Sequence, residues 1–186
     1  MRRSPDQFTP WQKLLHWSMA AGILAMLFIG VGMVSTIDRD YLLLVGLHKP
    51  LGVVLLMLVV IRLLLRWRSG APALPDGMPV AMKLAARLSH VLFYILMLAM
   101  PLLGWAMLSA ANYPVVAAGF RLPAIVPVSA ELHDLLWNAH RFLAMVLFAL
   151  FLLHLAAALF HAWVRRDGVF EAMAPFGRNS KRSAGR

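Results

Sequence analysis

The sequence predicts an all-α integral membrane protein, a four-helix bundle with both termini in the cytoplasm. Three observations lead to this class: the chain is very apolar, its charges leave four long runs with few or no charged residues, and its basic residues are spread unevenly between the connecting segments. Of its 186 residues, 61% are hydrophobic and only 14% are charged, and the mean hydropathy is +0.74. A soluble domain has about a quarter of its residues charged.

Each of the four runs is long enough to cross a membrane, which takes about 20 mainly apolar residues. The third run continues uncharged to Phe120, but Asn112-Tyr113-Pro114 marks an end, so an outer loop is expected after about Ser109. Pro101 is expected to kink the third helix. The predicted spans are 14–36, 42–66, 84–109 and 140–163.

A secretory signal is the alternative interpretation of the first run, with Arg2 and Arg3 as its basic region. The run is longer than a signal core of about 7–15 residues, and no small-x-small cleavage site clearly follows it. A retained first helix is therefore expected.

The orientation follows from the way the net charge of +10 is distributed between the connecting segments. The segments 1–13, 62–87 and 165–186 hold 14 Lys and Arg against 4 Asp and Glu, whereas 38–49 and 121–141 hold 4 of each. The positive-inside rule places the first set in the cytoplasm. The charge is thus a sign of membrane topology, and no nucleic-acid partner is expected. Residues 177–186 are predicted to form a disordered basic tail.

Seven histidines are present, and all but His133 lie in or at the edges of the spans. His140 and His154 are fourteen residues apart in the fourth run, which places them on one helix face about 21 Å apart. By depth, His140 matches His48 near the outside and His154 matches His16 near the cytoplasm. Two bis-imidazole sites at two heights in a four-helix bundle are typical of two b-type haems.

Zinc is the alternative metal, but it prefers three or four protein ligands, often with carboxylates. The predicted spans contain no Asp or Glu, which favours haem. Arg62 lies fourteen residues after His48 and repeats its helix face one leaflet deeper. There it has two interpretations, a partner for a propionate of the inner haem or an arginine that extends to the membrane surface.

His161 follows His154 by seven residues, near the cytoplasmic surface. Since quinone reduction takes up protons and histidine titrates near neutrality, His161 is a candidate quinone ligand or proton donor. A structural histidine is the alternative. The roles of His90 and His133 stay open, and His133 is the natural rival of His140 as a ligand.

These features together resemble the bacterial cytochrome b561 family, over nearly the whole chain. The resemblance is carried by Leu15-His16-Trp17, by His48-Lys-Pro-Leu-Gly52 with Arg62, by Leu88-Ser-His90 through Gly104, and by His140, His154, His161 and Met173-Ala-Pro175. It implies a single membrane cytochrome b domain over residues 1–186.

The resemblance also implies an activity, that of a superoxide:ubiquinone oxidoreductase with two haem b groups. His16, His48, His140 and His154 match the axial ligands of that family, and His161 matches a histidine of its quinone pocket. Periplasmic superoxide would be oxidised to oxygen and ubiquinone would accept the electrons. Lys49 and Arg141 are expected to attract the superoxide anion, and a homodimer is left open.

Two alternatives remain at the level of the sequence. One is a cytochrome b subunit that passes electrons from a periplasmic dehydrogenase or hydrogenase to quinone, although the short outer loops favour a protein that acts alone. The other is a transporter with a histidine proton relay and no haem, which predicts no visible absorbance.

Overall fold

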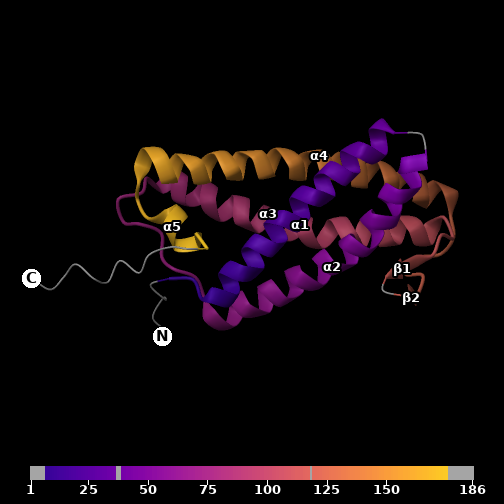
Figure 1. The fold of residues 1–186 in the computed structure, drawn as a ribbon, viewed down its shortest axis with the longest axis horizontal. Coiled ribbons are helices and arrows are strands. Elements are labelled where there is room, and N and C mark those ends of the chain that lie inside the picture. Colours follow the sequence, from indigo (N-terminus) through magenta and orange to yellow (C-terminus); the bar gives the residue numbers. More distant parts are fainter. Residues whose placement is uncertain (1–6, 37–38, 118, 176–186) are drawn as a thin grey trace, which may run out of the picture.

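A computed structural model describes residues 7–36, 39–117 and 119–175, and four long helices dominate it (Figure 1). All four are long and apolar enough to cross a membrane, which confirms the expected number of spans. The predicted tail 177–186 lies outside the described residues. The helices are α1 (Pro10–Ser35), α2 (Arg39–Ser69), α3 (Val80–Ala110) and α4 (Ala130–Phe160).

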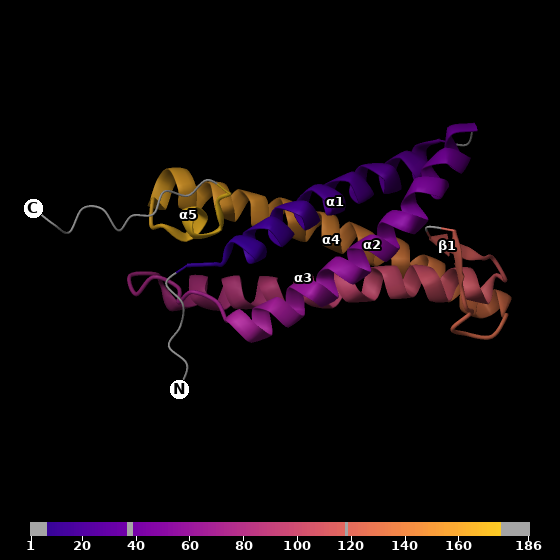
Figure 2. The same cartoon turned by 60° about the horizontal axis from the view of Figure 1, so that its bottom comes forward.

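The helices form two antiparallel hairpins that lie against each other (Figures 1 and 2). α1 packs closely along α2, and α3 packs closely along α4. The packing of α2 on α3 is looser, and α1 and α4 approach each other still less closely. Between α3 and α4 the core is a small cluster of Leu96, Leu147 and Leu150.

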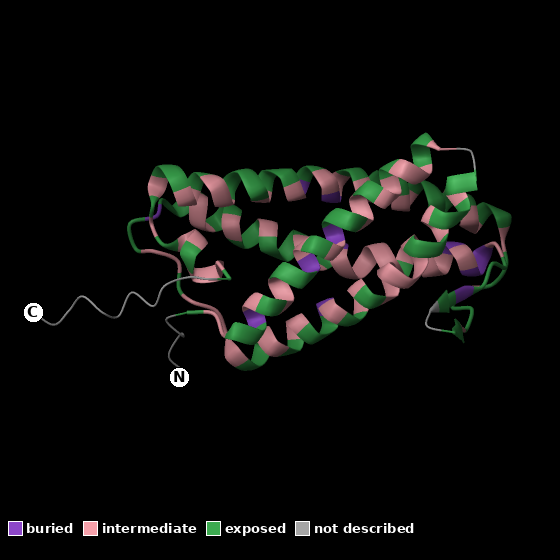
Figure 3. Cartoon of the chain, in the orientation of Figure 1, coloured by how far each residue is buried: buried purple, intermediate pink, exposed green. Residues whose placement is uncertain are grey.

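Few of the described residues are buried (Figure 3), and many large apolar side chains of the helices are exposed. Examples are Phe28, which is 70% exposed, and Leu42, which is 73% exposed. A soluble monomer rarely exposes so large a continuous apolar surface. In a bilayer, hydrocarbon chains would cover this surface. The helices can lie in hydrocarbon because their backbone N–H and C=O groups form hydrogen bonds with one another.

Local sequence signals explain where α1 begins and how it is fixed to α2. Thr9 and Gln12 form a capping box, in which each side chain accepts a hydrogen bond from the other residue's backbone N–H. Pro10 occupies the first helical turn, where its missing N–H costs nothing. The Gln12 side chain also donates to the Gly70 carbonyl over 2.9 Å, which ties the start of α1 to the end of α2.

α3 ends where the sequence predicts. Asn112 adopts a left-handed conformation with φ 57°, and the N–H of Tyr113 donates to the Leu108 carbonyl over 2.9 Å, so this is a C-terminal cap. Pro101 lies inside α3 and Pro50 inside α2, and neither ends its helix.

The all-α prediction is wrong in one detail. After α3 the chain forms a short antiparallel hairpin, β1 (Val115–Ala117) and β2 (Phe120–Leu122), which packs against α2 and α3. Two three-residue strands offer too short a pattern for alternation of polar and apolar residues to reveal them.

α4 begins at Ala130, ten residues before the predicted span 140–163. The Ser129 hydroxyl accepts a hydrogen bond from the Leu132 N–H over 3.2 Å, which caps the helix. The Ser129 N–H in turn donates to the Ala110 carbonyl at the end of α3. Charged residues before 142 bound the apolar run but do not interrupt the helix, so its first turns extend beyond the uncharged segment.

At the other end, α4 passes into a π-helical turn, η1 (His161–Arg165), followed by the short helix α5 (Val169–Met173). Arg166 between them is left-handed, with φ 52°, which turns the chain back. The Trp17 indole N–H donates to the Met173 carbonyl over 2.9 Å, and so α5 is held against the start of α1.

Candidate haem centres

One candidate site, called the outer site after the predicted orientation, consists of His48 on α2 and His140 on α4. Their ring centroids are 6.2 Å apart and the ring planes meet at 65°. Nδ1 of each ring is buried and lacks a hydrogen-bond partner within the described part of the chain. Gly104 of α3 makes room for this pair, since a Cβ there would lie 3.4 Å from Cε1 of His140.

The inner candidate site lies fourteen residues further along α4. His16 of α1 and His154 of α4 have ring centroids 6.3 Å apart, again with planes at 65°. His90 of α3 is a third imidazole here, 5.9 Å from His154, and the Phe93 ring lies 5.2 Å from His154. The structure therefore brings together both histidine pairs that depth alone had predicted.

Both separations fit an iron atom between two imidazoles. A metal–nitrogen bond of about 2 Å on each side, plus about 1.1 Å from each nitrogen to its ring centre, gives about 6 Å between the centroids. Among the described residues no group of three or more His, Cys, Asp or Glu side chains is arranged to hold a metal ion by itself. The histidine pairs therefore suit a group that needs only two axial protein ligands, as haem does.

Arg62 lies at the inner site, as its spacing from His48 predicts. Its Nε donates to the Tyr94 hydroxyl over 3.3 Å, its side chain is half-buried, and it is within electrostatic range of His16 and His154. A guanidinium at this position can form a bidentate pair with a carboxylate, the group that a haem propionate presents.

His161 is part of a hydrogen-bonded cluster at the C-terminal end of α4 that the sequence did not reveal. Its Nδ1 lies 2.9 Å from Oδ2 of Asp167, and Nε of Arg165 donates to the same oxygen over 2.9 Å. Burial raises the pKa of the Asp167 carboxyl, but the hydrogen bonds from Arg165 and His161 outweigh this and hold the pKa below its ordinary value.

This carboxylate orients the His161 ring by binding Nδ1 and leaves Nε2 for another partner. Asp167 lies six positions after His161 in the sequence, but this spacing alone does not indicate a contact between the two side chains. The π-helical turn and the left-handed Arg166 bring Asp167 back to the His161 ring.

Three further candidate residues, His133, Lys49 and Arg141, lie on the same helices as the outer histidine pair. His133, the rival ligand, has Nδ1 at 3.0 Å from the Met107 carbonyl, so it joins the start of α4 to α3 and is not the partner of His48. Lys49 and Arg141 directly follow His48 and His140 in their helices, Lys49 half-buried and Arg141 exposed.

Four apolar helices that hold two pairs of facing imidazoles are the architecture of a membrane electron-transfer protein with haem. The family profile of prokaryotic cytochrome b561 matches residues 7–176, so the chain belongs to the prokaryotic cytochrome b561 family. Membership confirms the resemblance seen in the sequence and implies haem b.

Known relatives match nearly the whole chain. It is 28% identical over 178 residues to cytochrome b561 homolog 1 of Escherichia coli K12, covering 91% of this chain and 98% of the relative. It is 30% identical over 174 residues to cytochrome b561 homolog 2 of the same bacterium, covering 91% and 92%. It is also 30% identical over 173 residues to the probable superoxide oxidase CybB of Yersinia pestis, covering 92% and 80%.

Proposed function

We propose that this protein binds two haem b groups and transfers electrons from periplasmic superoxide to ubiquinone in the bacterial inner membrane. The observation that carries the proposal is the pair of facing imidazoles at each of two heights, 6.2 Å and 6.3 Å apart between ring centroids. When bound, haem supplies reversible one-electron transfer, which no amino-acid side chain of this chain provides.

His48 and His140 would hold the haem of the outer site, and His16 and His154 would hold that of the inner site. The fit of both separations to an iron–imidazole geometry supports this assignment. Arg62 would pair with a propionate of the inner haem, and its hydrogen bond to Tyr94 holds the guanidinium in place for this.

The overall reaction balances with two superoxide ions for each quinone. Each superoxide gives up one electron and leaves as oxygen. The two electrons, with two protons, convert ubiquinone to ubiquinol. Lys49 and Arg141 stand beside the outer ligands in the sequence and would favour the approach of an anion.

His161 is the residue that would bind ubiquinone and give it a proton. Because the Asp167 carboxylate accepts a hydrogen bond from Nδ1, Nε2 is free to face a quinone carbonyl oxygen. Protons are available at this end, where Asp167 and Arg165 are half-buried at the surface. The choice of superoxide as donor is supported by the name of the Yersinia pestis relative, a probable superoxide oxidase.

The test is a direct assay of the purified holoprotein in lipid nanodiscs, with enzymatically generated superoxide and ubiquinone as the only acceptor. We expect ubiquinol formation well above the spontaneous reaction, and loss of this excess in His154→Ala. A wild-type rate equal to the spontaneous one would reject superoxide as the donor. Copurification of a periplasmic redox subunit would point instead to the subunit alternative.

A further inference from the structure

Arg165, the last residue of η1, contacts three parts of the chain with the three nitrogens of its guanidinium. Its Nε donates to Oδ2 of Asp167 over 2.9 Å. Its Nη2 donates over 3.4 Å to the carbonyl of Gly77, in the connection between α2 and α3, and its Nη1 donates over 3.6 Å to Sδ of Met82, in the first turn of α3. The guanidinium therefore joins the end of α4 to residues that lie 88 and 83 positions earlier in the sequence.

The connection between α2 and α3, residues 70–79, is itself fixed to the bundle. Met78, the residue after Gly77, is buried with 4% of its surface exposed. At the start of the connection, the Gly70 carbonyl accepts a hydrogen bond from the Gln12 side chain of α1. Figures 1 and 2 show the connection at the same end of the molecule as η1 and α5. Because the connection is anchored in this way, its bond to Arg165 restrains the guanidinium.

On its other side, Arg165 holds the carboxylate that binds His161. Both oxygens of Asp167 are engaged, since Oδ1 accepts from the Val169 N–H over 3.4 Å and Oδ2 accepts from Arg165 and lies 2.9 Å from Nδ1 of His161. The side chains of His161 and Asp167 are only 12% and 13% exposed, so water has little access to their contact. Burial raises the pKa of the Asp167 carboxyl, and the hydrogen bond from Arg165 is the strongest influence that lowers it.

We propose that Arg165 is a positioning residue, which fixes the His161 ring through Asp167 relative to α3 and the α2–α3 connection. A guanidinium suits this role because its nitrogens form a rigid planar fork that reaches several acceptors at once, whereas lysine offers a single nitrogen. The bridge from Asp167 to the connection is a property of the fold. That the ring held in this way serves ubiquinone rests on the proposed function.

The first test measures the bridge without any electron transfer. Arg165→Met removes every donor at a similar side-chain length and should lower the melting temperature of the holoprotein by about 2–6 °C, with unchanged haem content. In the Asp167→Asn background the same substitution should lower it by less than half as much, because the two residues share one interaction. Arg87→Met, at an exposed position of α3, is the matched control, with little change expected. Equal losses in both backgrounds would overturn the proposal.

The second test follows the oxidation of chemically reduced holoprotein by a short-chain ubiquinone without oxygen, so it does not depend on the natural electron donor. Arg165→Met should lower the limiting rate about three- to tenfold, and it should have no further effect in the Asp167→Asn background. Arg165→Lys keeps the charge but can replace only one of the three contacts. Its rate should therefore lie between those of the wild type and Arg165→Met.

Losses in rate that multiply in the double variant would show that Arg165 acts independently of Asp167, which contradicts a positioning role. A wild-type rate in Arg165→Lys would reduce the role to charge alone and contradict it as well. The two hypotheses fail in different ways. If ubiquinone does not oxidise the reduced wild type, the proposed function is wrong, and the melting temperatures still decide whether the bridge exists.

Discussion

His90 makes the inner site different from the outer one at the scale of single residues. Three imidazoles meet there, and His90 is as close to His154 as His16 is, with centroids 5.9 Å and 6.3 Å from it. Only a pair can occupy the two axial positions of one haem iron. The separation of the His16 pair is closer to that of the outer pair, which is why we assign His16 as the ligand.

Substitution of these histidines tests the assignment. His154→Ala and His16→Ala should each lower the haem content from two to one per chain, because the inner iron loses an axial ligand. His90→Ala should retain both haems. The measurement is the ratio of extracted haem to protein. Two haems in His16→Ala and one in His90→Ala would exchange the roles of these residues.

Asp167 gives a prediction that depends on pH. Its lowered pKa means that the folded state favours the carboxylate, so its stabilising effect is complete above the ordinary pKa of 3.8 and is lost as the pH falls through the lowered value. Asp167→Asn should therefore melt at a lower temperature than the wild type at neutral pH. The difference should disappear in strong acid, where the wild-type carboxyl is protonated too.

The same variant should also reduce ubiquinone on the order of tenfold more slowly at neutral pH, since the His161 ring loses its orienting partner. Glu171→Gln, which removes an exposed carboxylate nearby, is the control for net charge.

For the melting experiment, a difference in melting temperature between wild type and Asp167→Asn that grows toward acid would contradict the assigned hydrogen bonds.

At the scale of elements, the sequence predicted the four helices well because each has a long apolar run. It predicted their ends less well, because the ends are set by caps and contacts. The fourth run suggested a start near residue 140, whereas Ser129 starts α4 at Ala130. The hairpin β1–β2 and the His161–Asp167 contact depend on turns that no periodic pattern records.

Packing of α3 on α4 provides a test at this scale. Gly104→Val should remove the outer haem and keep the inner one, because a Cβ already stands 3.4 Å from the His140 ring and two further methyl groups would displace it. Gly30→Val is the matched control, since nothing lies within 4 Å of a Cβ at that position. Haem content and the absorbance of the reduced protein report both effects. A Gly104→Val protein with two haems would show that the ring can move without loss of ligation.

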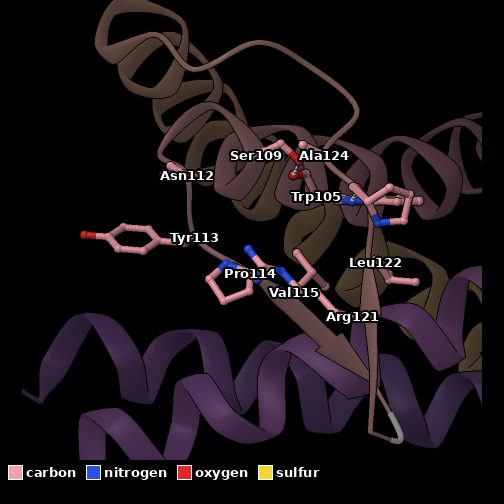
Figure 4. A pocket seen from close by; sticks show the side chains of 10 residues that line it. Trp105, Ser109, Asn112, Tyr113, Pro114, Val115, Arg121, Leu122 and Ala124 are labelled. Carbon is pink, nitrogen blue, oxygen red and sulfur yellow. Dashed lines mark hydrogen bonds between the residues drawn. The ribbon is translucent and has the colours of Figure 1, made fainter.

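At the scale of the whole molecule, the histidine pairs were predictable because a regular helix converts spacing in sequence into depth and direction. The pairing across helices then followed from matching depths, and the structure brings the same residues together. The half-open pocket between the end of α3 and the β1–β2 hairpin (Figure 4) was not predictable, because it combines the end of α3 with a hairpin that folds back over it.

The orientation proposed from the charge distribution is testable because the chain contains no cysteine. Single cysteines can be placed at Phe120, an exposed residue of the hairpin, and at Asp76, in the connection between α2 and α3. In cells with a permeabilised outer membrane, an impermeant maleimide should label Phe120→Cys and not Asp76→Cys. The opposite pattern would place the termini outside.

The number of haems per chain shows directly whether both histidine pairs are haem sites. We expect the purified wild-type protein to contain two haem b groups per chain, with a b-type spectrum in the reduced-minus-oxidised difference. The double variant His48→Ala/His140→Ala should retain one haem, at the inner site. A wild-type protein with one haem per chain, or with no visible absorbance, would contradict the account.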